Sequence, residues 1–392
     1  MPLYEDSKYH PLFIGDMHPV KLMDGNKVVF EPNVSELSGE IISVAKTYND
    51  NAYIKIFGKT VEIGEGEKSP DNPYELKSVG DDGGFDLVSC GRNIWDGSLI
   101  EGHVRPTDGE ELSWEGFYKT DFIPVPPDTD YAITYTKPSS GTTFWAIYYD
   151  INKNYISSQN LAPFTPPFSI KTPIGTTYLR ITGATSSMTT LTQIELGSSA
   201  TPYEPFRGMQ TINFPYTLRS LPDGTCDYIL IDNVQKRAWY YQLTGEKVLD
   251  GTESWQKYKE LLWTENKIGV ALYSITPTAT VSTGELCTHF RRALVTGDSG
   301  FVATANGFRA TSSGFYFAIT ISGITDIESW QSFLAAQHAA GTPVTVQYKL
   351  ANPPEPIELD YNEIKTFYPF TQIYTTATVQ PTLDGKFRVW GS

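Results

Sequence analysis

Short runs of alternating apolar and polar residues, separated by turn-forming residues, recur along most of the chain. "AYIKIFG" (52–58) is followed by "TVEI", "YELKSVG" and "FDLVSC", with Pro-, Asp- and Gly-rich segments between them. Because successive side chains of a strand point to opposite faces, this pattern predicts short, half-buried strands joined by tight turns. The chain is therefore predicted to be an all-β protein.

Two segments show helical spacing of their apolar residues instead. "TESWQKYKELL" (252–262) begins with a Thr that can cap a helix. "TDIESWQSFLAAQHAAG" (325–341) has Thr and Asp before its start and Gly341 at its end, which are typical start and stop signals. One or two short helices are thus expected within the C-terminal part of the chain.

The predicted strands fall into four consecutive units, because 392 residues exceed what one ordinary core can hold. Residues 1–40 are predicted to form an N-terminal attachment segment with a hairpin, and 41–92 a small β module. Residues 93–207 carry about eight short strands between turns, which is typical of a jelly roll or β-sandwich. Residues 208–392 are predicted to form a C-terminal β-sandwich domain.

The segment "QIELGSSATPYEPF" (193–206) closes the third unit. Its apolar run stops at Gly197, and Pro202 and Pro205 can neither enter a helix nor both join a central sheet. We therefore expect an extended cover that crosses the edge of the sandwich. Burial of Tyr203 and Phe206 is expected to hold this cover in place.

Composition and charge limit the kinds of molecule that the chain is expected to bind. The net charge of −15 makes nucleic acid an unsuitable partner for the chain as a whole. Aromatic residues make up 13% of the sequence, which fits neutral partners such as sugars, or other protein subunits. The three cysteines, Cys90, Cys226 and Cys287, are widely spaced without a CxxC motif, so we expect packed thiols rather than disulfides or a zinc site.

The first residues, "MPLYEDSKYHPLFIGDMH", contain early acidic residues and only a four-residue apolar run. This pattern is not that of a secretory signal peptide. No stretch approaches the roughly 18 apolar residues of a membrane span. We expect synthesis in a bacterial cytoplasm and no membrane insertion.

Residues 56–93, "IFGKTVEIGEGEKSPDNPYELKSVGDDGGFDLVSCGRN", resemble a segment of tail-associated proteins from phages and prophages of Gram-positive bacteria. In that family, a Gly-Lys/Arg-Ser/Thr strand leads to a Pro-containing loop, a "V-x-I-x-S-V-G" strand, a Gly turn and "G-x-N". The chain departs from this pattern at "EIGEGEKSPDN", where the usual form is closer to "QDGTPTPDN".

Two further segments share this resemblance. "QIELGSSATPYEPF" is similar to the closing strand of carbohydrate-binding-module-like sandwiches in the same phage proteins, and residues 344–376 resemble their final part. The resemblance implies a virion tail or baseplate protein that binds host cell-wall or capsular polysaccharide and other tail proteins. By analogy it also implies a homo-oligomer, with a trimer expected from the assembly of tail proteins.

Sugar-binding modules stack aromatic rings on pyranose rings and fix the hydroxyl groups with a few polar side chains. The candidates in 93–207 are Trp95, Trp114, Tyr118, Trp145, Tyr149 and Tyr155. In "TFWAIYYD" the two-residue period places Trp145, Ile147 and Tyr149 on one face, and one of the two faces must be core. Trp114 lies in the polar stretch "ELSWEGFYK" and is expected to be the most exposed.

Motifs for catalysis or for a cofactor are not found in the sequence. "DINKN" (150–154) starts like a calcium loop but has Tyr155 and Leu161 at the sixth and twelfth positions. "DDGGFD" (81–86) reads as a β-turn, with a structural calcium ion as the alternative. Cys287 and His289 could share a strand face, but no third residue is seen that would orient the histidine. We expect no catalytic residues and no cofactor.

The sequence thus predicts a phage tail or baseplate protein that binds host glycan without turnover. One alternative is a purely structural adaptor or fibre, in which Trp114 and the face carrying Trp145 are buried, in the monomer or at a subunit interface. A second is a surface-polysaccharide depolymerase, which needs a cleft with two facing carboxylates.

Overall fold

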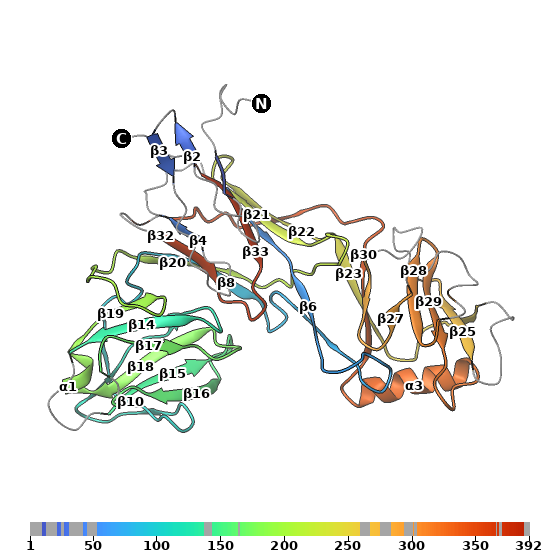
Figure 1. The fold of residues 1–392 in the computed structure, drawn as a ribbon, viewed down its shortest axis with the longest axis horizontal. Coiled ribbons are helices and arrows are strands. Elements are labelled where there is room, and N and C mark those ends of the chain that lie inside the picture. The colour runs from blue at the N-terminus through green and yellow to red at the C-terminus, as the bar shows by residue number, and fades with distance from the viewer. Residues whose placement is uncertain are drawn as a thin grey trace.

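The computed structural model describes residues 10–12, 22–24, 27–30, 42–44, 53–136, 143–163, 165–258, 267–274, 284–293, 301, 304–365, 367 and 371–387. In the first four ranges and in 385–387 only the backbone is described. These residues form a central β-sandwich that carries two further β domains (Figure 1). The prediction of an all-β, multi-domain chain with few helices is confirmed.

The central sandwich consists of two antiparallel sheets. One has the order β1 (His10–Leu12), β33 (Thr382–Phe387), β5 (Tyr53–Phe57), β21 (Tyr228–Asp232), β22 (Arg237–Tyr241) and β31 (Ile357–Leu359). The other has the order β20 (Met209–Phe214), β8 (Phe85–Cys90), β32 (Thr371–Thr375) and β4 (Ile42–Val44). Alternate residues such as Ile54, Ile56 and Ile229 point into the core between the sheets, together with Leu87 and Ile212.

Strands from distant parts of the chain build this sandwich, and this differs from the predicted division into consecutive units. β5, from the predicted 41–92 module, pairs with β21 and β33, which belong to the predicted 208–392 domain. One domain is inserted between β8 and β20, where Cys90 is the register partner of Met209. Another is inserted between β22 and β31. Local pattern located the strands, but long-range pairing decides which of them share a core.

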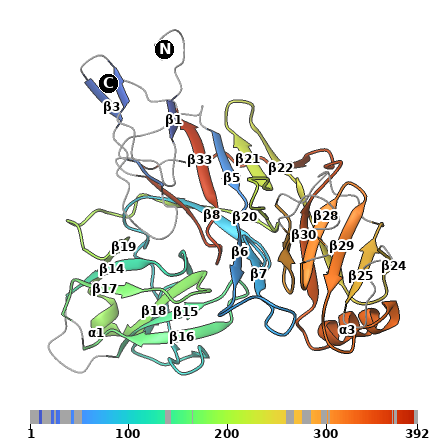
Figure 2. The ribbon, with the colours of Figure 1, turned by 45° about the vertical axis from the view of Figure 1, so that its right-hand side comes forward.

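Two hairpins extend from the sandwich. β2 (Leu22–Asp24) pairs with β3 (Lys27–Phe30), which forms the hairpin predicted within residues 1–40. β6 (Thr60–Ile63) pairs with β7 (Glu75–Ser78), and this hairpin lies between the two inserted domains (Figure 2). The predicted attachment segment 1–40 therefore contributes the β2–β3 hairpin and β1, which pairs with β33.

The first inserted domain is the predicted jelly roll. Its larger sheet contains β16 (Tyr155–Asn160), β15 (Phe144–Tyr149), β18 (Tyr178–Ala184), β12 (Phe117–Lys119) and β9 (Ile100–Glu101), with β13 (Ile123–Pro124) also paired to β18. Its smaller sheet has the order β17 (Phe168–Lys171), β14 (Asp130–Tyr135) and β19 (Leu191–Leu196). β10 (His103–Val104) pairs with β11 (Glu111–Leu112), and α1 (Thr185–Met188) follows β18.

The second inserted domain, called the distal domain here, packs two sheets and a helix. One sheet has the order β23 (Thr244–Leu249), β30 (Val344–Lys349) and β26 (Leu286–Cys287). The other has the order β24 (Gln256–Lys257), β25 (Ile268–Leu272), β29 (Gly314–Ile319), β28 (Gly307–Thr311) and β27 (Arg291–Arg292). Trp330 of α3 (Ile327–Ala339) is buried in the shared core beside Phe290 and Phe317.

The two helix predictions have different outcomes. α3 is confirmed, with Asp326 as its N-cap: Asp326 accepts a hydrogen bond from the Ser329 N–H at 2.8 Å. Gly341 follows in the left-handed region at φ +78°, which ends the helix. The helix predicted over 252–262 is wrong for its described part, where β24 pairs with β25 as a strand. Residues 259–262 lie outside the described residues.

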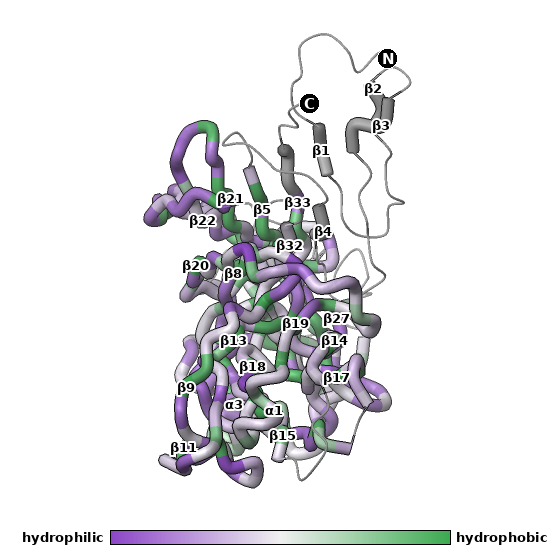
Figure 3. Tube along the Cα trace, turned by 90° about the vertical axis from the view of Figure 1, so that its left-hand side faces the viewer, coloured by the Kyte–Doolittle hydropathy of each residue, from purple (hydrophilic) through white to green (hydrophobic). Residues whose placement is uncertain are grey.

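Two simpler expectations concern the cysteines and the bilayer. All three cysteines are free, and Cys90 and Cys287 are buried, as packed thiols should be. Within the described ranges no helix has the length and apolar character needed to cross a bilayer. The hydropathy of the trace shows hydrophobic and hydrophilic residues alternating along the strands (Figure 3).

Candidate functional site

The outer face of the larger jelly-roll sheet carries most of the candidate residues. Along β15, Phe144, Ala146 and Tyr148 enter the main core, and Trp145 and Tyr149 lie on the opposite face. This is the alternation predicted from "TFWAIYYD". A second layer, formed by β10, β11 and the residues between them (103–112), covers part of this outer face and makes a small cluster with it through Val104. Which residues remain accessible therefore depends on that layer.

Trp114 is the most exposed of the candidates, as predicted, with 48% of its surface accessible. One face of its indole ring stacks on His103, with centroids 5.0 Å apart and an interplanar angle of 17°. The ring of Phe117 meets it edge-on at 5.4 Å. These two contacts hold the indole in one orientation while much of its surface stays open to solvent.

The other candidates are less accessible. Trp145 and Tyr155 are half-buried in the outer cluster, and the Tyr155 hydroxyl donates a hydrogen bond to the carbonyl of Pro106 at 2.6 Å. Tyr149 is buried, and Tyr118 is half-buried against the main core on the other side of the sheet. The structure therefore does not bring all five predicted residues onto one open surface. Trp95 is also buried, at the opposite side of the domain core.

A charged group that sequence reasoning missed is centred on Glu111 of β11. Glu111 accepts hydrogen bonds from Lys119 and from Arg180, the latter at 2.5 Å. Arg180 is almost fully buried, its Nε donates to the carbonyl of Thr120, and its guanidinium lies 4.5 Å from the ring centre of Phe122. Bonds from Lys119 and Arg180 lower the pKa of Glu111 below its ordinary value.

His103 links this charged group to the tryptophan. Burial, and the charge of Lys119, lower the pKa of His103, so the imidazole under Trp114 is neutral near pH 7. Its Nδ1 lies 3.1 Å from the hydroxyl of Thr182 on β18. We call the exposed surface around Trp114 the Trp114 face. The polar residues around Trp114 in the sequence predict that this surface is exposed. No local pattern in the sequence predicts the contact of Glu111 with Arg180.

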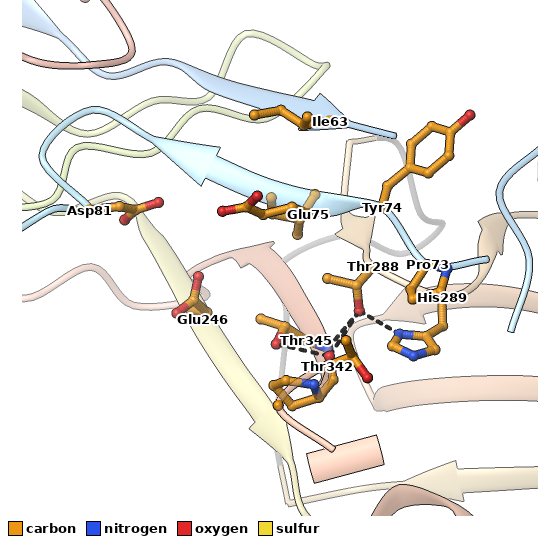
Figure 4. A pocket seen from close by; sticks show the side chains of 13 residues that line it. Ile63, Pro73, Tyr74, Glu75, Asp81, Glu246, Thr288, His289, Thr342 and Thr345 are labelled. Atoms are coloured by element: carbon orange, nitrogen blue, oxygen red, sulfur yellow. Dashed lines mark hydrogen bonds between the residues drawn. The ribbon is translucent and has the colours of Figure 1, made fainter. Parts of the chain in front are cut away.

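A second hollow lies where the β6–β7 hairpin meets the distal domain, and we call it the seam cavity. It has a volume of about 510 Å³. The carboxyl groups of Glu75, Asp81 and Glu246 lie on one side of it, and Thr288, His289, Thr342 and Thr345 on the other (Figure 4). The backbone N–H of Tyr74 donates to the carbonyl of Thr288 at 2.9 Å and joins the hairpin to the distal domain.

The carboxylates of the seam cavity have structural partners. Asp81 accepts a hydrogen bond from the backbone N–H of Ser78 and so closes the turn after β7. Glu246 pairs with Arg219 at 3.3 Å and accepts from the Gln347 amide at 2.9 Å. Burial raises the pKa of Asp81 above its ordinary value. Asp81 therefore closes a turn and Glu246 joins Arg219 to the distal domain, which does not favour a pair of facing catalytic groups.

His289 forms the floor of the seam cavity and is fully buried. Its Nδ1 lies 2.8 Å from the Thr288 hydroxyl and its Nε2 lies 3.3 Å from the Gln337 side-chain oxygen. Burial lowers its pKa, so the ring is neutral near pH 7. The thiol of Cys287 is buried with its pKa raised to about 11, which does not suit a nucleophile activated by a histidine.

The turns considered for calcium are closed by their own hydrogen bonds. Asp150 accepts from the N–H of Asn154 at 2.7 Å and from its amide at 3.0 Å. Asp86 accepts from the amide of Asn213 at 2.9 Å. Among the residues that the structure describes, no group of three or more His, Cys, Asp or Glu side chains is arranged to hold a metal ion.

Comparison of the chain with protein-family models found no match, and neither did searches of curated proteins and of solved structures. The resemblance seen in residues 56–93 stays an expectation from the sequence. The functional interpretation therefore depends on the surface features described above for this chain.

Proposed function

We propose that the chain is a phage virion protein of the tail or baseplate that binds glycan on the host cell surface, with Trp114 as the principal contact. The single observation that carries this proposal is the exposed, oriented indole of Trp114 on the Trp114 face. A ring that is fixed before binding loses little side-chain freedom when a sugar stacks on it. The mechanism is adsorption without turnover.

Three features of the Trp114 face support a sugar as the ligand. The indole offers an apolar surface that can stack on a pyranose ring, and its contacts with His103 and Phe117 hold it in one orientation. The neutral His103 beneath the ring places no charge there. The structural adaptor without sugar binding predicts burial of Trp114 in the monomer or at a subunit interface, and an exposure of 48% does not fit burial in the monomer.

The location and the partners follow from the resemblance in the sequence and belong to the same proposal. Assembly with other tail proteins and with further copies of this chain would place many Trp114 faces on one virion. Linked weak sites raise the effective concentration of the ligand, so modest affinity for each site suffices for adsorption. Light scattering on the purified chain tests the expected trimer.

Binding of the full chain to intact Gram-positive cells and to their extracted wall polysaccharide tests the function. Trp114→Ala is expected to weaken binding about tenfold, since an aromatic contact contributes about 0.5–1.5 kcal/mol. Tyr273→Ala is the matched control, because Tyr273 is an aromatic residue of the distal domain with 40% exposure. Saturable binding that Trp114→Ala weakens and Tyr273→Ala preserves supports the proposal.

Two results would overturn it. Absence of saturable binding by the folded wild-type chain would favour the structural adaptor. Release of reducing sugars from the wall polysaccharide would favour the depolymerase, and the seam cavity would then be the first place to search for its carboxylates.

A further inference from the structure

A groove that the Trp114 face does not include lies where the jelly roll ends. It has a volume of about 470 Å³, which is in the range of small-molecule sites. Its walls come from the segment after β8, from α1 and β19, and from residues 201–206, which we call the strap. The residues that matter to its chemistry are Asn93, Trp95, Asp96, Thr189, Tyr203 and Phe206.

Hydrogen bonds from buried polar side chains hold the strap. Glu195 accepts from the Thr201 N–H at 2.8 Å and from the Thr201 hydroxyl at 2.6 Å. Gln193 accepts from the Glu204 N–H at 2.8 Å, and Arg92 pairs with the Glu204 carboxylate at 2.7 Å. Gln193 and Glu195 are both almost fully buried beneath the strap. The strap is thus fixed on both sides of residue 203.

These anchors present Tyr203 to solvent. The ring was expected to be buried and to hold the strap in place, yet it is 64% exposed, and this expectation is wrong. Hydrogen bonds at Thr201 and Glu204 already hold the strap in place, so burial of the Tyr203 ring is not needed. Tyr203 lines the groove. The ring is exposed on a segment that hydrogen bonds hold on both sides of it. It is therefore pre-organised for contact with a ligand.

The polar groups of the groove indicate which ligand it suits. Trp95 and Phe206 give it an apolar floor, and Asp96, which accepts hydrogen bonds from the Ser98 N–H and hydroxyl, keeps further acceptor capacity for a ligand. None of the described residues lining the groove is Lys or Arg. An anionic sugar such as a uronic acid would find no cation there, whereas neutral and amino sugars can bind Asp96.

We propose that this groove is a second saccharide site, in which a neutral or amino pyranose stacks on Tyr203 while its hydroxyl groups bind Asp96. The ligand class rests on the proposed function, but the site does not depend on Trp114. The two sites lie in the same inserted domain and can bind separate parts of one polymer, which raises avidity without further contacts.

Titration of the full chain with cellobiose, lactose, N,N′-diacetylchitobiose and a glucuronic-acid disaccharide, followed by saturation-transfer NMR, tests this site. The variants are Tyr203→Ala, Asp96→Asn, Trp114→Ala and the double variant Tyr203→Ala/Trp114→Ala. We expect a neutral or amino disaccharide to retain transfer in Trp114→Ala, to lose at least half of it in Tyr203→Ala, and to lose nearly all of it in the double variant. The acidic disaccharide is expected to bind at least tenfold more weakly.

The outcomes separate the two sites. If Tyr203→Ala binds every disaccharide as the wild type does, or if no disaccharide binds, the second site is overturned. If Trp114→Ala has no effect while Tyr203→Ala does, the second site stands and the assignment to Trp114 fails. Asp96→Asn keeps the shape of the side chain, so weaker binding in that variant supports contact with the carboxylate rather than loss of folding. Circular dichroism spectra that match the wild type confirm that each variant is folded.

Discussion

The carboxylate of Glu195 accepts both the backbone N–H and the side-chain hydroxyl of Thr201, at 2.8 and 2.6 Å. Glu195 lies on β19 and is almost fully buried, so this pair joins the last strand of the jelly roll to the chain segment that leaves it. A buried carboxylate is stable only when hydrogen bonds replace its lost water. The pair therefore explains why the closing segment has Thr after the turn and Glu in the strand.

Thr201→Val removes the hydroxyl and keeps the shape of the side chain. We expect the free energy of unfolding to fall by about 1–3 kcal/mol, because a buried charged acceptor loses a donor. Urea unfolding measures this change. Thr211→Val, at an exposed position of β20, is the control and is expected to change stability by less than about 0.5 kcal/mol. Equal stability of the two variants would contradict the role of the pair.

Glu111→Gln removes the negative charge that Lys119 and Arg180 share. Both cations are nearly buried, so we expect a loss of about 2 kcal/mol at pH 7, in the range for hydrogen bonds to charged groups. The folded pKa of Glu111 is lowered below its ordinary value of 4.5. Its stabilising effect is therefore present above that value and is lost as the pH falls through the folded pKa.

Chemical denaturation between pH 7 and pH 3 measures this contribution. The wild type and Glu111→Gln should differ most at pH 7 and converge at acid pH. A difference that stays constant over this range would show that the charge of Glu111 does not contribute.

His289 is expected to make the distal domain sensitive to mild acid. Burial lowers its folded pKa below the ordinary value of 6.5, so below about pH 6.5 the unfolded chain binds the proton more readily. Stability should therefore be complete above pH 7 and fall as the pH drops through 6.5. Thermal unfolding at pH 7.5 and 5.5 should show a smaller shift for His289→Gln than for the wild type. His103→Gln is the comparison for the jelly roll, since the pKa of His103 is lowered as well.

Tyr374 connects the central sandwich to the jelly roll. It lies on β32, packs into the jelly-roll core, and donates its hydroxyl to the carbonyl of Pro124 at 2.9 Å. Tyr374→Phe should lower stability by about 1 kcal/mol, the usual contribution of one hydrogen bond. Calorimetry should show the loss in the transition shared by both domains. Tyr273→Phe, at the surface of the distal domain, should leave that transition unchanged.

The sequence was sufficient for features that local pattern determines. Alternation located β5 to β8 and both faces of β15, and the capping residues Asp326 and Gly341 located α3. The same reasoning placed a helix at 252–262, where pairing with β25 imposes a strand on residues 256–257. Propensity is a weak guide when a neighbouring strand supplies the hydrogen bonds.

Features that depend on long-range contacts could not be predicted. Nothing local in residues 85–90 reveals that β8 pairs with β20 and β32, so the insertion of the jelly roll is invisible in the sequence. The period of β15 showed which residues share a face but not that Val104 of β10 packs against Tyr149. Trp114 was placed correctly because its polar neighbours are local. Tyr203 was wrongly predicted to be buried, because the strap is held by polar side chains of β19 and not by burial of the ring.

The insertion of the jelly roll between β8 and β20 also determines how the protein would respond to a pulling force. The domain is joined to the sandwich through Cys90 and Met209, which are register partners on neighbouring strands. A tether between the jelly roll and a cell would pull both strands along their length, against β32 and the facing sheet. The ladder bonds of β8 with β32 would then be loaded together in shear rather than opened one at a time. This geometry suits an attachment that has to resist drag.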